Sequence, residues 1–303
     1  MGRPVVEPAE SWSRATITDA AAPISLSGNE SSDSPAGEIQ FIGNATTLIR
    51  YRGFTILTDP TFLHQGEYVH LGHGAYARRE VEPACQIRDL PPVDLIVLSH
   101  YHGDHFDEVA VRELNKDLPV VTNDHAVSKL QQQGFSQGYA LDTWSSQRVI
   151  RGQNELRITA MPGKHAPDHV QGLLPPVMGS MLDFSRDGEH QLRLYISGDT
   201  LLHERLHDIP RWFPRIDVAL VHAGGTTLLG TVVTMTGEQA VRAVEVVRPR
   251  TAIPIHYNDY SVFLSGLSEF QEAAAHSSTT AEFRYLAHGD TYDVKAQSVS
   301  GAS

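Results

Sequence analysis

The chain has 303 residues, enough for one large domain or two small ones with a sizeable buried core. Its 36 acidic residues outnumber the 24 basic ones, and the formal net charge of -12 argues against a nucleic-acid-binding protein, which needs a basic surface. No apolar run approaches the roughly 18 residues of a membrane span, and the first residues do not read as a signal peptide. The single cysteine, Cys85, fits a reducing compartment. We expect a soluble, cytoplasmic protein that acts on a small molecule without stable membrane association; no sequence feature indicates an oligomeric state.

The first 37 residues have the composition of a flexible N-terminal tail, because they are rich in Ser, Ala, Pro and acidic residues without clear periodicity. An arm packed on the domain is the alternative. From Glu38 the chain becomes strand-like, with a turn at Arg52-Gly53. We therefore place one domain at residues 38–295 and a C-terminal tail at 296–303.

Beyond residue 90, strand and helix patterns alternate. Strands are predicted at residues 93–99, 119–123, 155–161, 179–184, 192–197, 216–221, 251–255 and 283–287. Helices are predicted at residues 106–116, 125–134, 236–248 and 264–275, the third opened by a capping box of Thr236 and Gln239. This order favours two sheets covered by helices. A singly wound Rossmann-like fold is the competitor, but the chain lacks G-x-G-x-x-G between a strand and a helix.

A dense group of potential metal ligands follows the strand at 93–99. The segment "SHYHGDHFD" contains His100, His102, Asp104 and His105. Imidazole and carboxylate groups are preferred ligands of Zn²⁺ and similar ions. Because residues two apart in an extended loop point to the same side, His100 and His102 can hold one ion together. Asp104 and His105 follow a turn at Gly103 and can reach a second ion.

The same chemistry recurs at three later strand ends. His165 follows the strand at 155–161, Asp199 follows the one at 192–197, and His256 follows the one at 251–255. Strand ends of layered α/β folds gather at one edge, where functional sites form. Singly, each of these residues reads more readily as a solvated or hydrogen-bonded side chain, but their joint occurrence predicts a metal site.

These motifs resemble the metallo-β-lactamase superfamily. "SHYHGDH", the third histidine, "SGDT" and "IHY" carry the resemblance, which covers residues 38–290. "IGNATTLIRYRGFTILTDPTF" and "IRDLPPVDLIVLSHYHGDHFD" look closest to the branch of N-acyl-phosphatidylethanolamine phospholipase D and the ascorbate-6-phosphate lactonases. The chain departs from that phospholipase family at Thr234-Met235-Thr236, where the family has a histidine. The resemblance implies an αββα sandwich of two mixed sheets flanked by helices, with two metal ions at one edge.

The resemblance also implies roles for the ligands. His100, His102 and His165 would bind the first ion, Asp104, His105 and His256 the second, and Asp199 would bridge the two. Asp59, in "ILTDP", matches an acidic residue that orients a ligand. The ions would be two divalent cations, with Zn²⁺ expected first and Mn²⁺ or Fe accepted by the same ligands.

The implied activity is hydrolysis by a water that two ions activate, with Asp104 or Asp199 accepting a proton. We expect an ester, lactone or amide of a small molecule as substrate. A phosphodiesterase of the phospholipase D type is the alternative. A metal-bound domain that binds ligands without catalysis is a third reading, disfavoured by the complete ligand set.

Other side chains near the motifs are candidates for a substrate pocket. The residues adjacent to ligands or ending a strand are Tyr101, His169, His222, Tyr257 and Asn258. For His222 a structural role is the stronger reading. His64, His70 and His73 lie on a loop that is expected to be solvated or to cap the site. His203 and His207 are expected on a solvated helix face.

Overall fold

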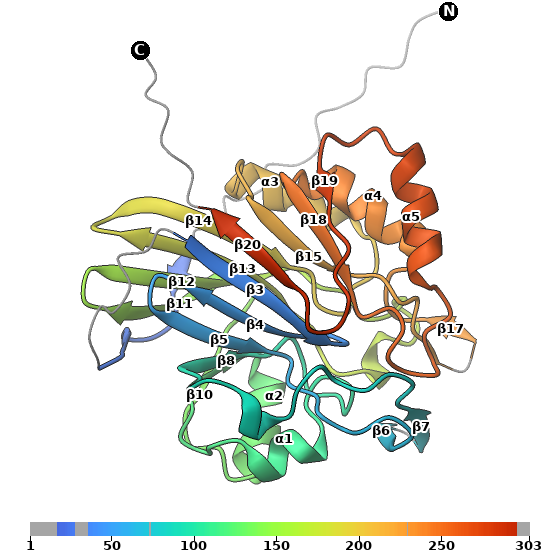
Figure 1. The fold of residues 1–303 in the computed structure, drawn as a ribbon, viewed down its shortest axis with the longest axis horizontal. Coiled ribbons are helices and arrows are strands. Elements are labelled where there is room, and N and C mark those ends of the chain that lie inside the picture. The colour runs from blue at the N-terminus through green and yellow to red at the C-terminus, as the bar shows by residue number, and fades with distance from the viewer. Residues whose placement is uncertain (1–16, 28–35, 73, 229, 296–303) are drawn as a thin grey trace, which may run out of the picture.

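Two β-sheets pack face to face in the computed structural model, which describes residues 17–27, 36–72, 74–228 and 230–295 (Figure 1). Among these residues, the first sheet has nine strands: β1 (Thr18–Asp19), β2 (Ile24–Ser25), β11 (Ser145–Arg151), β12 (Asn154–Met161), β13 (Gly179–Arg186), β14 (Glu189–Ile196), β15 (Val218–His222), β18 (Thr251–Ile255) and β19 (Glu282–Phe283). The second has seven: β10 (Gly138–Ala140), β9 (Val120–Thr122), β8 (Leu95–Val97), β5 (Phe54–Thr58), β4 (Thr46–Tyr51), β3 (Ala36–Gly43) and β20 (Thr291–Lys295). Two hairpins, β6 (Tyr68–Gly72) with β7 (Ala75–Arg78) and β16 (Thr227–Leu228) with β17 (Thr231–Val232), stand apart from both sheets.

Helices cover the outer face of each sheet. On the second sheet lie α1 (Glu108–Glu113) and α2 (Asp124–Gln132), and on the first lie α3 (Ile209–Trp212), α4 (Gly237–Val247) and α5 (Leu267–His276). Three short 3₁₀ helices are η1 (Ile87–Asp89), η2 (Gln171–Leu173) and η3 (Glu204–Asp208). The expected αββα sandwich is therefore confirmed, and the Rossmann-like alternative is excluded because it has a single sheet.

Three apolar clusters match this layering. The central one joins the facing sides of both sheets, for example Ile56 and Phe41 with Leu182 and Leu220. The other two lie between each sheet and its helices. Both faces of the central strands are thus buried, which explains why residues 93–99 and 216–221 read as continuous apolar runs. Among the described residues, no helix is long and apolar enough to cross a membrane.

The predicted capping box at the start of α4 is confirmed, and one predicted strand is wrong. The capping box of α4 forms, since Thr236 Oγ1 accepts from the Gln239 amide at 3.3 Å and Gln239 Oε1 accepts from the Thr236 amide at 3.4 Å. The strand predicted at 283–287 is wrong: β19 ends at Phe283, and the last strand is β20 at Thr291–Lys295. The carbonyl groups of Arg250 and Ala252 accept hydrogen bonds from the amides of Glu282 and Arg284. The next residue of β18 on the side of β19 is Pro254, which has no N–H to continue the ladder.

The N-terminal tail prediction also needs correction. Within residues 1–37, strands β1 and β2 pair in parallel with β11, and the Ile24 side chain is buried in the central cluster. Residues 17–27 are therefore an arm on the first sheet, the alternative considered from the sequence. Residues 1–16, 28–35 and 296–303 lie outside the described part of the chain.

Candidate metal centre

Strands of both sheets end at one edge and present the predicted ligands there. The strands β14, β15 and β18 run parallel in the first sheet, as do β5 and β8 in the second, so their carboxyl ends coincide. Short loops after β5, β8, β12, β14 and β18 carry the side chains in question. These are Asp59, His100, His102, Asp104, His105, His165, Asp199 and His256.

The first donor group consists of three histidines. His102 Nδ1 lies 3.2 Å from His100 Nε2 and 3.3 Å from His165 Nε2. The His165 ring is fixed from behind, because its Nδ1 donates to the Val233 carbonyl at 3.0 Å and leaves Nε2 facing the other two rings. The structure therefore brings together the three side chains predicted for one ion.

The second donor group combines two carboxylates with two histidines. Asp199 Oδ1 lies 3.4 Å from His105 Nε2 and 3.5 Å from His256 Nδ1. Asp104 Oδ2 lies 3.6 Å from His256 Nε2 and 3.9 Å from His105 Nε2. In each donor group the ligand atoms all lie within 4.8 Å of one another. All four residues predicted around the second ion and the bridge are therefore neighbours, and the rings of His100 and His105, with centroids 4.2 Å apart, join the two groups.

Unsatisfied polar atoms converge between these side chains. Asp104 Oδ1, His105 Nε2, Asp199 Oδ1 and both ring nitrogens of His256 are buried without a hydrogen-bond partner. A buried polar atom without a partner costs about 1–3 kcal/mol, so a cluster of them indicates a group that satisfies all at once. Divalent ions fit this requirement, since imidazole nitrogens and carboxylate oxygens are their usual ligands.

The protonation of the donors agrees with metal binding. Burial lowers the pKa of His100 well below its usual value and that of His102 to about 3, so both rings present a free lone pair. Burial also opposes a charge on His105, but the carboxylates of Asp199 and Asp104 raise the pKa of His105 well above its usual value. These two carboxylates therefore favour positive charge among the donors, and bound cations would supply it.

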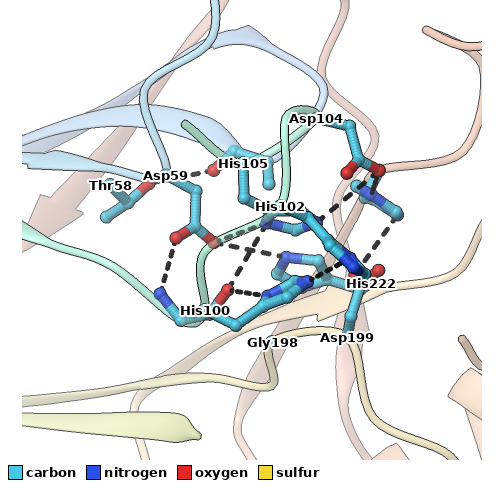
Figure 2. A network of polar contacts seen from close by, with 12 residues as sticks. Thr58, Asp59, His100, His102, Asp104, His105, Gly198, Asp199 and His222 are labelled. Carbon is cyan, nitrogen blue, oxygen red and sulfur yellow. Dashed lines mark hydrogen bonds and ion pairs between the residues drawn. The ribbon is translucent and has the colours of Figure 1, made fainter. Parts of the chain in front are cut away.

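Asp59 supports the second donor group from behind (Figure 2). Its Oδ2 lies 3.2 Å from His105 Nδ1, and its Oδ1 accepts from the Ser99 amide at 2.7 Å. Burial opposes its ionisation, but the hydrogen bond from His105 and the nearby ring of His222 lower the pKa of Asp59 to about 2. An ionised Asp59 holds the His105 proton on Nδ1 and turns Nε2 toward the site, the orienting contact that the sequence comparison implies.

His222 lies beneath the site rather than in a pocket. It is fully buried, its Nδ1 lies 3.1 Å from Ser197 Oγ, and its Nε2 lies 3.8 Å from Asp59 Oδ2. Its ring stacks on that of His105 with an interplanar angle of 14°. The prediction that His222 lines a substrate pocket is therefore wrong, and the structural role also considered describes its position.

The bridging candidate Asp199 has a partner that the sequence analysis missed. Thr234 Oγ1 donates to Asp199 Oδ2 at 2.8 Å, and the Thr234 side chain is fully buried. This contact occupies one carboxylate oxygen and leaves Oδ1 toward His105 and His256. Thr234 belongs to the segment Thr234-Met235-Thr236, at which the sequence departs from the phospholipase resemblance, and here it contacts a ligand candidate.

The backbone around His256 is held in an uncommon conformation. His256 has φ of 59°, in the left-handed region that non-glycine residues rarely adopt, and its amide donates to the Asn44 carbonyl at 2.9 Å. Asn44 in turn donates its side-chain amide to the Asp104 carbonyl. Gly224 packs against this turn, and a Cβ there would lie 2.3 Å from the His256 carbonyl oxygen. The absence of a side chain at Gly224 therefore permits this close backbone approach.

The site opens toward solvent beside His102. That residue is half-buried, whereas the other six ligand candidates are buried. A cavity of about 540 Å³ reaches His102 and is lined there by Tyr101, Gly103 and the hairpin residues Val69 and Gly72. The structure therefore places Tyr101, a predicted pocket residue, next to the accessible ligand.

The remaining predicted pocket residues lie elsewhere. Tyr257 and Asn258 line a different cavity of about 940 Å³ that no ligand candidate lines, and the Tyr257 hydroxyl donates to the Leu286 carbonyl at 3.3 Å. Their place in a substrate pocket stays a prediction. His169 is exposed in the turn before η2.

The other histidines singled out from the sequence lie outside the donor groups. His64 is exposed and pairs with Glu82, and His70 is exposed on β6. His73 falls outside the described residues. His207 is exposed, but His203 is half-buried at the start of η3, so the expectation of a solvated face is wrong for His203.

Comparison with known proteins agrees with this geometry. The sequence profile described as "Beta-lactamase superfamily domain" matches residues 55–257, from β5 to the residue after His256. The chain belongs to this superfamily. The match includes the seven ligand candidates and Asp59.

Proteins and solved structures that are similar to this chain extend the comparison. A metal-dependent hydrolase of Anaeromyxobacter sp. (strain K) is 27% identical over 255 residues, covering 83% of this chain and 85% of the relative. The crystal structure of an isothiocyanate hydrolase from Delia radicum gut bacteria has a TM-score of 0.70 at 22% identity, covering 86% of this chain and all of that one. A metallo hydrolase from Ignicoccus hospitalis has a TM-score of 0.62 at 21% identity, with the same coverage. These matches show the metallo-β-lactamase fold in this chain, and its buried donor groups could hold metal ions.

Proposed function

We propose that the protein hydrolyses an ester, lactone or amide bond of a small molecule with two divalent ions at this centre. The observation that carries the proposal is the convergence of seven donor side chains from four strand ends, six of them buried, with unsatisfied atoms on Asp104, His105, Asp199 and His256. When bound, two such ions supply Lewis acidity and an activated water for attack on an electrophilic carbon. The relatives called metal-dependent hydrolases support the hydrolytic class.

The chain's own residues set the geometry of that reaction. The Val233 carbonyl and the Asp59 carboxylate orient His165 and His105, and the Thr234 hydroxyl fixes Asp199. Asp199 Oδ1, facing His105 and His256, is the oxygen that we assign to the bridge. Asp104 Oδ1, buried without a partner, is the atom that we assign to accept a proton from the attacking water.

Metal content tests the first half of the proposal. After reconstitution with Zn²⁺, Mn²⁺ or Fe²⁺, elemental analysis should give close to two ions per chain, and a chelator should abolish hydrolysis reversibly. At most a trace of metal after reconstitution would contradict it. A stoichiometry of one ion would remove the bridging role of Asp199.

A substrate panel tests the second half. It comprises chromogenic esters, lactones, anilides and bis(p-nitrophenyl) phosphate. An isothiocyanate is added because the structural relative described above is a hydrolase of such compounds. Activity on the carbon esters, lactones or anilides supports the proposal. Activity on the phosphate diester alone would move the protein to the phosphodiesterases, and silence with both ions present would favour a non-catalytic binding domain.

A further inference from the structure

A second cavity lies beside the metal centre and is formed by three segments far apart in the sequence. It has a volume of about 390 Å³, within the roughly 300–1,000 Å³ of small-molecule sites. The β6–β7 hairpin, the loop around η2 and the β16–β17 hairpin enclose it; β6, β7 and β17 lie at the same end of the sandwich (Figure 1). Among the residues that the structure describes, those lining the cavity carry no charged or titratable side chain: Leu71, Gly72, Gly74, Ala75, Val170, Leu173, Leu174, Leu228, Thr231 and Val233.

Two residues connect this apolar cavity to the donor groups. Val233 lines it, accepts the hydrogen bond that orients His165, and precedes Thr234, the partner of Asp199. Gly72 lines both this cavity and the one that reaches His102. A molecule whose reacting group lies beside His102 can therefore extend an adjoining group into the apolar cavity.

We propose that this cavity binds the hydrocarbon substituent of the substrate, an alkyl chain or ring next to the scissile bond. The inference rests on the proposed function. The surrounding surface fits an apolar occupant, since Leu173 is 60% exposed at the rim. Because the lining residues that the structure describes offer neither charge nor a titratable group, a charged substituent would lose its hydration against them without compensation. The protein then discriminates between substrates by the chain length and the apolar area of this substituent.

A homologous series of p-nitrophenyl esters on the metal-loaded full chain tests the assignment. From acetate to hexanoate, kcat/KM should rise about fourfold for each added methylene while the chain fits, the factor expected for transfer of one CH₂ from water. In Leu174→Asp the gain from acetate to hexanoate should fall at least tenfold. In Ala75→Phe, which fills the cavity, the preference should move to shorter chains. The matched control is Leu264→Asp, the same change at a side chain 71% exposed outside the cavity, and its series should equal that of the wild type.

Binding without turnover separates this inference from the proposed function. Calorimetric titration with octan-1-ol should give a Kd at least 50-fold lower than with butan-1-ol, and Leu174→Asp should lose this difference. If no ester, lactone or anilide is cleaved but octan-1-ol binds in this way, the proposed function fails and the apolar site stands. The assignment of the site would be overturned if kcat/KM did not change along the ester series and Leu174→Asp did not affect the binding of octan-1-ol. The assignment would also be overturned if the only effect of Leu174→Asp were to convert a dimer to a monomer, because the apolar surface would then be a contact between two copies of the chain.

Discussion

The hydroxyl of Thr234 donates a hydrogen bond of 2.8 Å to Asp199 Oδ2, on the side of the carboxylate away from His105 and His256. Both residues are buried, so the hydroxyl has no competing water and the carboxylate has little freedom to rotate. The position of Asp199 Oδ1, the assigned bridge, therefore depends on a residue that itself binds no ion.

Replacing Thr234 tests this dependence. Thr234→Val keeps the shape but leaves Asp199 Oδ2 without a donor, and loss of such a supporting contact typically costs about 10–100-fold in metal affinity or activity. Competition with a chromogenic chelator measures the affinity. Thr234→Ser retains the hydroxyl and should stay within a few-fold of the wild type; equal losses in both variants would mean that packing, not the hydrogen bond, matters.

Removing the charge of Asp199 should have a larger effect. An amide is a poor bridging ligand, so Asp199→Asn should weaken one site or let the ions move apart. Displacement of a nucleophile by about an ångström costs on the order of 100-fold in rate, and kcat should fall by at least that factor with the fold retained. Stopped-flow or steady-state assays with circular dichroism check both points. Near-normal turnover with two ions bound would show that Asp199 is not the bridge.

Asp59 should act through His105 without touching substrate. Asp59→Asn removes the charge that holds the His105 proton on Nδ1, and the affinity of the second site should fall about 10–100-fold while the first ion stays bound. Asp187→Asn is the matched control, since Asp187 is exposed and also has a positive φ of 51°. If both variants bind two ions like the wild type, Asp59 has no orienting role.

A methyl group at Gly224 should displace His256. The added Cβ would lie 2.3 Å from the His256 carbonyl oxygen, which is backbone and cannot move without shifting the ligand. Gly224→Ala should therefore bind about one ion per chain in place of two and lose activity. Gly266→Ala, where a Cβ meets no atom within 4 Å, is the control. Full metal content in Gly224→Ala would show that the turn adapts.

The stability of the fold should decrease in mildly alkaline solution because of His190. The hydrogen bond to Asp183 and the carboxylate of Asp217, 3.6 Å from His190 Nε2, raise the pKa of His190 to about 9, against a usual value near 6.5. The folded state thus holds the proton more tightly than the unfolded state. This stabilisation is complete below about pH 6.5 and is lost as the pH rises through 9. Urea denaturation from pH 6 to 10 should show a decline that His190→Gln lacks; parallel curves would contradict the assignment.

Sequence patterns were sufficient to predict which ligand candidates lie together, because each lies in a loop that follows an apolar strand. His165, Asp199 and His256 are recognisable in this way, since the strand before them fixes both direction and edge. Thr234 and Asn44 were not, because their contacts to Asp199 and Asp104 join residues 35 and 60 positions apart and leave no local pattern. Nor does any local pattern show that three separate segments enclose an apolar cavity.

The pairing of β1 and β2 with β11 has a consequence for the behaviour of the protein in concentrated solution. Without that arm, β11 would be the outermost strand of its sheet, with the carbonyl groups of Ser146 and Ile150 left without the amides of Ala20 and Leu26. An exposed strand edge is a template for strand addition by another molecule. The arm thus acts as a protective cover, and a chain shortened past Ser25 would be prone to self-association into insoluble aggregates even if its metal centre were assembled correctly.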